Sequence, residues 1–493
     1  MNITLTKQNP VLLETECLMV AIFENGLLSP AAQLIDQATD GAIKKLIAQG
    51  DFTGEMSQII TLYHLPNLKA KRLVLVGFGA QDKLTPALFV KAAQTAFSAL
   101  VKLPAKNAAC FFSEIALDTT DEAARVRFLS QLAEIANNKF DQFKSQKSDK
   151  TYLLADLQLA ATHDNPIAIA QGKAVANGVN LARLLANMPC NVCTPTYLAE
   201  QAIKLSHELT NVSVQVLEKE QLIELKMGCL LAVGQGSAHS PKLIEIHYQG
   251  AAAEQTPVVL VGKGITFDTG GISLKSPAGM EDMKFDMAGA ASVLGTIKSI
   301  AELKLPINVI GLIPTAENMP DGNAYRPGDI LTSMSGQTIE VNNTDAEGRL
   351  ILCDALTYAA RFNPHTVIDI ATLTGAIVMS LGYLFNGIFS NQNTLAHELI
   401  VAGQKSQDLA WHMPLVEEYN EGLKSHYADM TNSCKLAGAI TAACFLSRFT
   451  KAYRWAHIDC AGSAMPSDMN KAGGATGRPV PLLVEYLINV STR

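Results

Sequence analysis

The first third of the chain alternates short apolar runs with segments whose apolar residues recur every three or four positions. Apolar runs bounded by turn residues predict strands at 17–23, 72–76, 108–115 and 151–159. Amphipathic spacing predicts helices at 86–101 and 121–143. Because strands and helices alternate, we predict an N-terminal α/β domain with a largely parallel sheet over residues 1–163.

The same alternation continues beyond a long helical connector. Residues 164–187 have the pattern of one helix, and Pro166 suits its first turn. Further strands are predicted at 212–217, 230–236, 243–249, 258–262, 307–314, 367–370 and 455–459. Further helices are predicted at 197–209, 288–301 and 350–359. We therefore expect a linker helix over 164–187 and a C-terminal α/β domain over 188–493 with a mixed central sheet.

Composition narrows the class of protein. The 493 residues are 48% hydrophobic and 17% charged, as in compact globular proteins. The net charge of −7 gives no electrostatic reason to bind nucleic acid or an anionic membrane. Nine cysteines, scattered singly except for Cys190 and Cys193, fit free thiols in a reducing cytosol. The N-terminus lacks the pattern of a secretory signal, and the apolar stretch 366–385 contains Asp369, so we expect a cytoplasmic location and no membrane span.

Two acidic segments contain the candidate chemistry. Residues 343–350 read Asn-Thr-Asp-Ala-Glu-Gly-Arg-Leu, so that Asp345, Glu347 and Arg349 alternate along the chain. If this segment is extended, the three side chains point to the same side and face one cavity. A single Asp-x-Glu is more often a solvated turn. A second segment, 263–286, favours a functional site over a solvated turn, because it adds two more aspartates and two lysines. These residues are Lys263, Asp268, Lys275 and Asp286.

Four carboxylates that converge would repel one another and raise each other's pKa, and two divalent cations would remove that repulsion. Oxygen-rich ligation allows Mn, Zn, Mg or Co, so the sequence leaves the metal open. The two lysines have an ordinary interpretation as ion-pair partners. Alternatively, one is a neutral amine ligand and the other polarises a carbonyl group.

These two segments resemble the motifs of the leucyl aminopeptidase family, which are dinuclear metallo-exopeptidases. The resemblance extends over most of residues 170–490, including Thr315-Ala-Glu-Asn-Met-Pro320 and Ala371-Thr-Leu-Thr-Gly-Ala376. It implies that Asp268 and Glu347 bridge two metals, that Asp345 completes one site, and that Lys263 and Asp286 complete the tighter site. It also implies that Lys275 contacts the scissile carbonyl and that Arg349 holds a bicarbonate ion as general base. The residues implied to bind substrate are Lys275, Met283, Thr372, Leu373 and Gly375.

The resemblance implies a hydrolase that releases N-terminal amino acids, with Leu and other apolar residues favoured, from short peptides with a free N-terminus. It further implies a homohexamer. It also implies that residues 188–493 form the catalytic metallopeptidase domain. A cysteinylglycine dipeptidase role and a DNA-binding scaffold are the alternatives, and the acidic balance argues against the scaffold. No nucleophile turn of a serine hydrolase and no P-loop is present in the sequence. His457 and Asp459 are expected to be core residues.

Overall fold

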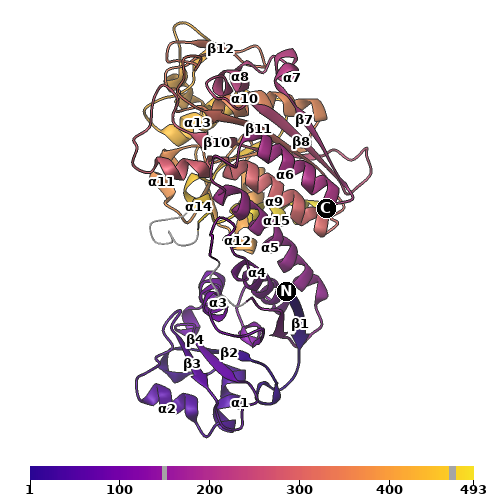
Figure 1. Ribbon diagram of the computed structural model, residues 1–493, viewed down its shortest axis with the longest axis vertical. Helices are drawn as coiled ribbons and strands as arrows, with labels where there is room; N and C mark the ends of the chain where they lie inside the picture. The colour runs from indigo at the N-terminus through magenta and orange to yellow at the C-terminus, as the bar shows by residue number, and fades with distance from the viewer. Residues whose placement is uncertain (147–152, 466–473, 493) are drawn as a thin grey trace. The chain divides into compact units, whose positions relative to one another are not determined.

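The computed structural model describes residues 1–146, 153–465 and 474–492. The chain divides into two compact units, Met1–Asn177 and Gly178–Arg493, and the division falls inside helix α5 (Pro166–Asn187) (Figure 1). Each unit builds its own sheet. The sequence predicted domain limits at residues 163 and 187, on either side of this division, and those limits remain a prediction.

The N-terminal unit is built on a sheet whose described strands are parallel except at one edge. Its spatial order is β1 (Asn2–Thr6), β6 (Asp156–Ala160), β5 (Asn107–Cys110), β2 (Cys17–Ile22), β4 (Arg72–Gly77) and β3 (Ile59–Tyr63). Among the described strands of this sheet, only β3 runs antiparallel to its neighbour. The prediction of a largely parallel sheet is therefore confirmed. Residues 151–152 of the predicted strand 151–159 lie outside the described residues.

Successive residues of the central strand β2 face opposite sides of this sheet, as a strand buried on both faces requires. Cys17, Met19 and Ala21 pack into the core with α3 (Pro86–Leu100) and α4 (Glu122–Ala136), while Leu18 and Val20 pack into the core with α1 (Pro30–Ala38) and α2 (Ala42–Ala48). Helix α4 ends seven residues earlier than predicted. There the Asn137 side chain bonds the backbone N–H and C=O of Leu154 and closes the helix end.

The C-terminal unit contains the mixed central sheet that was predicted. Its spatial order is β16 (Ala410–His412), β15 (Asn386–Ser390), β18 (Trp455–Asp459), β14 (Thr366–Ala371), β9 (Val258–Gly262), β11 (Asn308–Asn318), β8 (Lys242–Gln249) and β7 (Val212–Leu217), and β10 (Gly264–Asp268) pairs with β11 outside this path. The central strands β18, β14, β9 and β11 are parallel, whereas β8 and β15 run antiparallel to their neighbours in the centre. A small second sheet joins β12 (Ile330–Thr332), β13 (Thr338–Glu340) and β17 (Met430–Thr431).

Helices cover both faces of the central sheet (Figure 1). One face packs against α8 (Gly228–Gly234), α10 (Gly348–Ala359) and α13 (Gly438–Ser447). The other face packs against α6 (Pro195–Glu208) and α9 (Ala288–Glu302), and α9 in turn contacts α15 (Val480–Ser491). The remaining helices are α7 (Lys219–Glu224), α11 (Gly375–Leu381), α12 (Asn393–Ser406) and α14 (Ala461–Ala464). Within the described ranges, no helix combines the length and the hydropathy needed to cross a bilayer.

One predicted element has the wrong type. Residues 230–236 were expected to form a strand, but Gly228–Gly234 is helix α8. The Asp354 carboxylate of α10 accepts hydrogen bonds at 2.9 Å from the backbone N–H groups of Cys229 and Leu230, which lie in the first turn of α8. A helix N-terminus needs such acceptors, and this one comes from a residue more than 100 positions away in the sequence.

Candidate metal centre

The acidic side chains converge at the carboxyl ends of the central parallel strands, where α/β sheets place their sites. Lys263 directly follows β9, and Asp268 ends β10. Asp286 lies near the end of the 3-10 helix η5 (Met280–Met287), and Glu347 directly precedes α10. Asp268, Asp286 and Glu347 are all buried, and each contributes a carboxylate oxygen to a group in which these atoms lie within 4.8 Å of one another.

The segment 343–350 is a turn that connects β13 to α10, so the condition of an extended segment is not met. The backbone N–H of Ala346 donates to Asn343 O at 3.3 Å, and Glu347 is already in the helical region at the N-cap of α10. Its side chains still converge, because a buried asparagine outside the turn holds the backbone in place. The Asn432 amide accepts from the N–H of Asn342 and donates to Asn343 O at 2.7 Å.

Both lysines lie among the carboxylates. The Lys263 Nζ atom is 2.8 Å from Asp286 Oδ2 and 2.8 Å from Glu347 Oε1, and it donates to Thr372 O at 3.0 Å. The Lys275 Nζ atom is 2.9 Å from Asp268 Oδ2 and also contacts Asp345 Oδ1. Four carboxylates therefore face two ammonium groups, and the cluster carries an excess of negative charge.

The pKa values respond to burial and to this crowding. Burial raises the pKa of Asp268 and that of Asp286, and the charge of Glu347 raises both further. Burial, followed by the charge of Asp268, raises the pKa of Asp345. Burial works to lower the pKa of Lys263, but the charges of Asp286, Glu347 and Asp268 outweigh it and raise that pKa above its ordinary value. The protein charges alone thus keep this lysine protonated.

The donor set fits divalent cations. Asp286 Oδ2, Asp345 Oδ1 and Glu347 Oε1 lie at ion-pair distance from a lysine, yet none accepts a hydrogen bond of acceptable geometry from the described residues. Buried polar atoms without such a bond are rare and call for an explanation, and carboxylate oxygens are ligands of Mg, Mn and Zn. A cation at this cluster would balance the excess negative charge, and these oxygens, which otherwise contact a lysine, could bind it.

Arg349 lies beside the cluster and is buried. Its Nη1 atom donates to Asn432 O at 3.0 Å, and its Nε atom is buried without a hydrogen-bond partner among the residues that the structure describes. Burial lowers the pKa of Arg349 to about 10, against the opposing effect of Glu347 and Asp459. A charged guanidinium with an unused donor fits a small planar anion.

The predicted substrate residues come from two segments around Asp286. Thr372 follows β14, and its hydroxyl donates to Asp286 Oδ1 at 2.8 Å. Leu373 and the start of α11 at Gly375 come next, and the N–H of Leu373 donates to Asp459 Oδ1 at 3.1 Å. Met283 is half-buried in the same 3-10 helix as Asp286. The structure thus places Thr372 in contact with the cluster, with the other predicted residues on the segments that flank it.

Sequence reasoning gave no role to four polar residues that support the cluster. These are Asn318, Tyr325, Thr344 and Asn432, and three of them bond one another or the backbone of the 343–350 turn. The Tyr325 hydroxyl donates to Thr344 O at 2.7 Å, and the Thr344 hydroxyl donates to Gly270 O at 2.6 Å. The only sequence signal for Asn318 was its place in the run 315–320 noted above.

His457 and Asp459 are buried core residues, as expected. The His457 Nδ1 atom lies 2.5 Å from Asp369 Oδ1, and Trp455 Nε1 donates to Asp369 Oδ2 at 2.6 Å. Burial works to lower the pKa of His457, but Asp369 outweighs it and raises that pKa.

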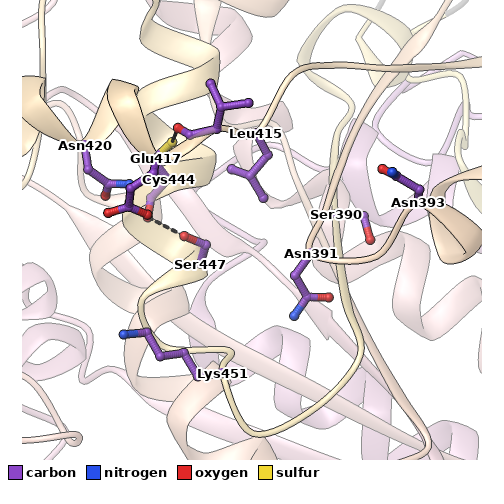
Figure 2. A pocket seen from close by; sticks show the side chains of 10 residues that line it. Ser390, Asn391, Asn393, Leu415, Glu417, Asn420, Cys444, Ser447 and Lys451 are labelled. Atoms are coloured by element: carbon purple, nitrogen blue, oxygen red, sulfur yellow. Dashed lines mark hydrogen bonds between the residues drawn. The ribbon is translucent and has the colours of Figure 1, made fainter.

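A polar cavity of about 390 Å³ in the C-terminal unit is lined by Asn391, Glu417, Cys444, Ser447, Lys451 and neighbours (Figure 2). None of the predicted site residues lines it. Some side chains around this cavity form hydrogen bonds within the protein. The Ser447 hydroxyl, for example, donates to Cys444 O at 2.7 Å.

Comparisons with known proteins agree on one family. The model of the cytosol aminopeptidase family catalytic domain matches residues 180–484, and that of the family's N-terminal domain matches residues 19–147. A probable cytosol aminopeptidase of Methylobacillus flagellatus is 51% identical over 96% of both chains. The cytosol aminopeptidase of Pseudomonas aeruginosa is 50% identical over 97% of both chains.

Two solved structures extend this likeness to the fold. A lysine-to-glutamate mutant of tomato leucine aminopeptidase superposes with a TM-score of 0.90 at 33% identity, covering 99% of this chain and 96% of that one. The bottromycin maturation enzyme BotP in complex with Mn superposes with a TM-score of 0.84 at 31% identity, covering 97% of this chain and 100% of that one.

Proposed function

This chain belongs to the cytosol aminopeptidase family and is a peptidase of the hydrolase class, and from that premise we propose a metal-dependent aminopeptidase that releases Leu and other apolar N-terminal residues from short peptides. The observation that supports this proposal most strongly is the buried group formed by Asp268, Asp286 and Glu347. A cluster of buried carboxylates is costly without cations, and the same cluster is suited to holding them.

The residues proposed to hold two divalent cations are Lys263, Asp268, Asp286, Asp345 and Glu347. Asp268, Asp286, Asp345 and Glu347 would hold the cations through carboxylate oxygens, and Lys263 would do so as a neutral amine, so that it would have to give up the proton that the carboxylates favour without metal. When bound, two such cations act as Lewis acids and make a water molecule acidic enough to attack a carbonyl carbon near neutral pH. Mn or Zn are the proposed metals, with Mg or Co as alternatives; BotP has been solved with Mn.

Lys275 is the proposed electrophile. Its side chain is about a quarter exposed, and its ammonium group contacts Asp268 and Asp345. Burial works to lower the pKa of Lys275, but the surrounding carboxylates outweigh it and raise that pKa, which keeps the group charged. A fixed positive charge beside the scissile carbonyl oxygen stabilises the negative charge that develops there.

Arg349 is proposed to hold bicarbonate, which when bound would supply a general base beside the cluster. The free Nε donor and the buried positive charge of Arg349 support this assignment. Met283, Thr372, Leu373 and Gly375 are proposed to bind the first residue of the peptide. An apolar pocket separates side chains by only about 1–3 kcal/mol per methylene, so a broad preference for apolar residues is expected.

The proposed setting is a cytoplasmic homohexamer. All nine cysteines are free thiols, in agreement with a reducing compartment. Large apolar side chains are exposed on the C-terminal unit, including Met379 at 88%, Leu436 at 79% and Tyr427 at 77%. Contiguous apolar patches are typical of surfaces that subunits cover, and the proposal places these side chains in subunit contacts.

Hydrolysis of leucine p-nitroanilide tests the proposed function. We expect chelation to abolish the activity of the wild type and added Mn or Zn to restore it, whereas Asp345→Asn stays inactive at the same metal concentration. N-acetyl-leucine p-nitroanilide is the matched substrate without a free amine, and it should not be hydrolysed. A folded, metal-loaded wild type without activity on any peptide with a free amine would refute the proposal.

A further inference from the structure

A buried asparagine links the two acidic segments. Asn318 is the last residue of β11 and lies opposite Asp268 in the β10–β11 register. Its side chain is fully buried. The amide nitrogen Nδ2 donates to Asp268 Oδ1 at 2.8 Å and to Thr344 O at 3.1 Å. One side chain therefore contacts a carboxylate of the 263–286 segment and the carbonyl group directly before Asp345.

The orientation of this amide is fixed by its partners. Both atoms at Nδ2 are acceptors, so the NH₂ group and not the oxygen must face them. Within the described part of the chain, the oxygen Oδ1 is left buried without a hydrogen-bond partner. It points toward Gly271, where an added Cβ would lie 2.9 Å away. The side chain thus gives both of its N–H donors to the two acidic segments and leaves its oxygen unpaired among the described residues.

The backbone around Asn318 is equally constrained. The N–H and the hydroxyl of Thr269 donate to Asn318 O at 3.1 and 2.8 Å. Thr344 O accepts from the Tyr325 hydroxyl as well as from Asn318, so both of its lone pairs are used. Asp268 Oδ1 accepts a second bond from the N–H of Gly270 at 2.8 Å, which leaves Oδ2 turned toward the cluster and Lys275.

We propose that Asn318 is a positioning residue that sets the rotamer of Asp268 and its distance from the Asp345 turn for the binding of two divalent cations. The inference rests on the proposed function. Outer-shell hydrogen bonds that orient ligands typically change metal affinity 10- to 100-fold when they are lost. Asn318 orients two ligand segments at once, because its single NH₂ group donates to both of them.

The test compares Asn318→Leu with a matched control, Asn386→Leu. Asn386 is also fully buried, and its Nδ2 donates to the Asp408 carboxylate and to Leu409 O, both at 3.0 Å, away from the cluster. The measurements are the Mn²⁺ dissociation constant by titration calorimetry on the metal-free full-length protein, and the thermal midpoint with and without Mn²⁺. A residue needed only for folding lowers both midpoints equally and leaves the dissociation constant unchanged.

We expect Asn318→Leu to raise the Mn²⁺ dissociation constant about 10- to 100-fold and to reduce the rise in midpoint that Mn²⁺ causes. Asn386→Leu should lower the midpoint with and without Mn²⁺ alike. Asn318→Ser, whose hydroxyl supplies one donor instead of two, should show a smaller loss of affinity and decides the question if Asn318→Leu does not fold. Wild-type affinity in the variants that fold would overturn the inference. A wild type that binds no Mn²⁺ would refute the proposed function instead.

Discussion

Replacing Gly348 by alanine should separate stability from metal binding. Gly348 is the first residue of α10, where alanine ordinarily stabilises a helix relative to glycine. Here a Cβ would lie 2.6 Å from Lys263 Cε, 2.8 Å from Lys263 Nζ and 2.9 Å from Leu373 Cδ1. All three atoms are at the ends of flexible side chains, so the fold can adapt, but the Lys263 amine must move.

The size of the effect follows from these distances. Ordinary contacts between carbon atoms are about 3.5–4.0 Å, so Lys263 must move by roughly 1 Å from its place beside Asp286 and Glu347. A misplacement of about 1 Å can reduce catalysis about 100-fold. We therefore expect kcat/KM to fall about 100-fold, equivalent to about 2.7 kcal/mol of transition-state stabilisation, with little change in the thermal midpoint.

The assay is kcat/KM on leucine p-nitroanilide with Mn²⁺, together with the Mn²⁺ dissociation constant and the thermal midpoint. Gly438→Ala is the matched control, because Gly438 is likewise the first residue of a helix and its added Cβ would meet only Ala376 Cβ at 3.3 Å. This variant should keep its kcat/KM within about twofold. Wild-type kcat/KM and Mn²⁺ affinity in Gly348→Ala would show that the placement of Lys263 is not what the cluster depends on.

Three further outcomes are expected. Thr372→Val removes the hydroxyl that donates to Asp286, a bond to a charged group worth about 1.5–3 kcal/mol, so kcat/KM should fall at least about tenfold, and an unchanged value would contradict this role. His457→Gln should lower the thermal midpoint more at pH 6 than at pH 9. The folded-state pKa of His457 is raised, so its contribution to the free energy of unfolding is complete below its ordinary pKa of about 6.5 and is lost as the pH rises through the folded value. Equal losses of thermal midpoint at both pH values would refute this expectation. Gly271→Ala should lower the thermal midpoint, because the φ of 67° at this position is strained for alanine and the new Cβ would lie 2.9 Å from Asn318 Oδ1. An unchanged midpoint would count against that strain.

The parts of the fold that the sequence predicted well are those with strong local patterns. The strand 258–262 is a continuous run of β-branched and apolar residues, and it is β9 in the middle of the central sheet. The helix 164–187 has a long amphipathic pattern and is α5. Residues 230–236 failed because a short apolar run does not distinguish a strand from a buried helix, and the Asp354 carboxylate that completes α8 is distant in the sequence.

The candidate site was predictable as far as residue chemistry goes. The spacing of acidic residues identified the carboxylates that the structure brings together, Asp268, Asp286 and Glu347. The conformation of the 343–350 turn was not predictable, because it depends on bonds from Asn432, about 90 positions away. Asn318 was missed as a separate contributor for the same reason: its two partners belong to different segments, and only the fold brings them together.

The number of cations bound by each chain tests the central claim most directly. Elemental analysis of the Mn²⁺-loaded wild type and of Glu347→Gln, paired with leucine p-nitroanilide hydrolysis by the same samples, is the measurement. We predict two Mn²⁺ per wild-type chain, and fewer than two together with a loss of activity in Glu347→Gln. A wild type that is fully active without bound divalent metal, or a Glu347→Gln variant with two Mn²⁺ and wild-type kcat/KM, would contradict the claim.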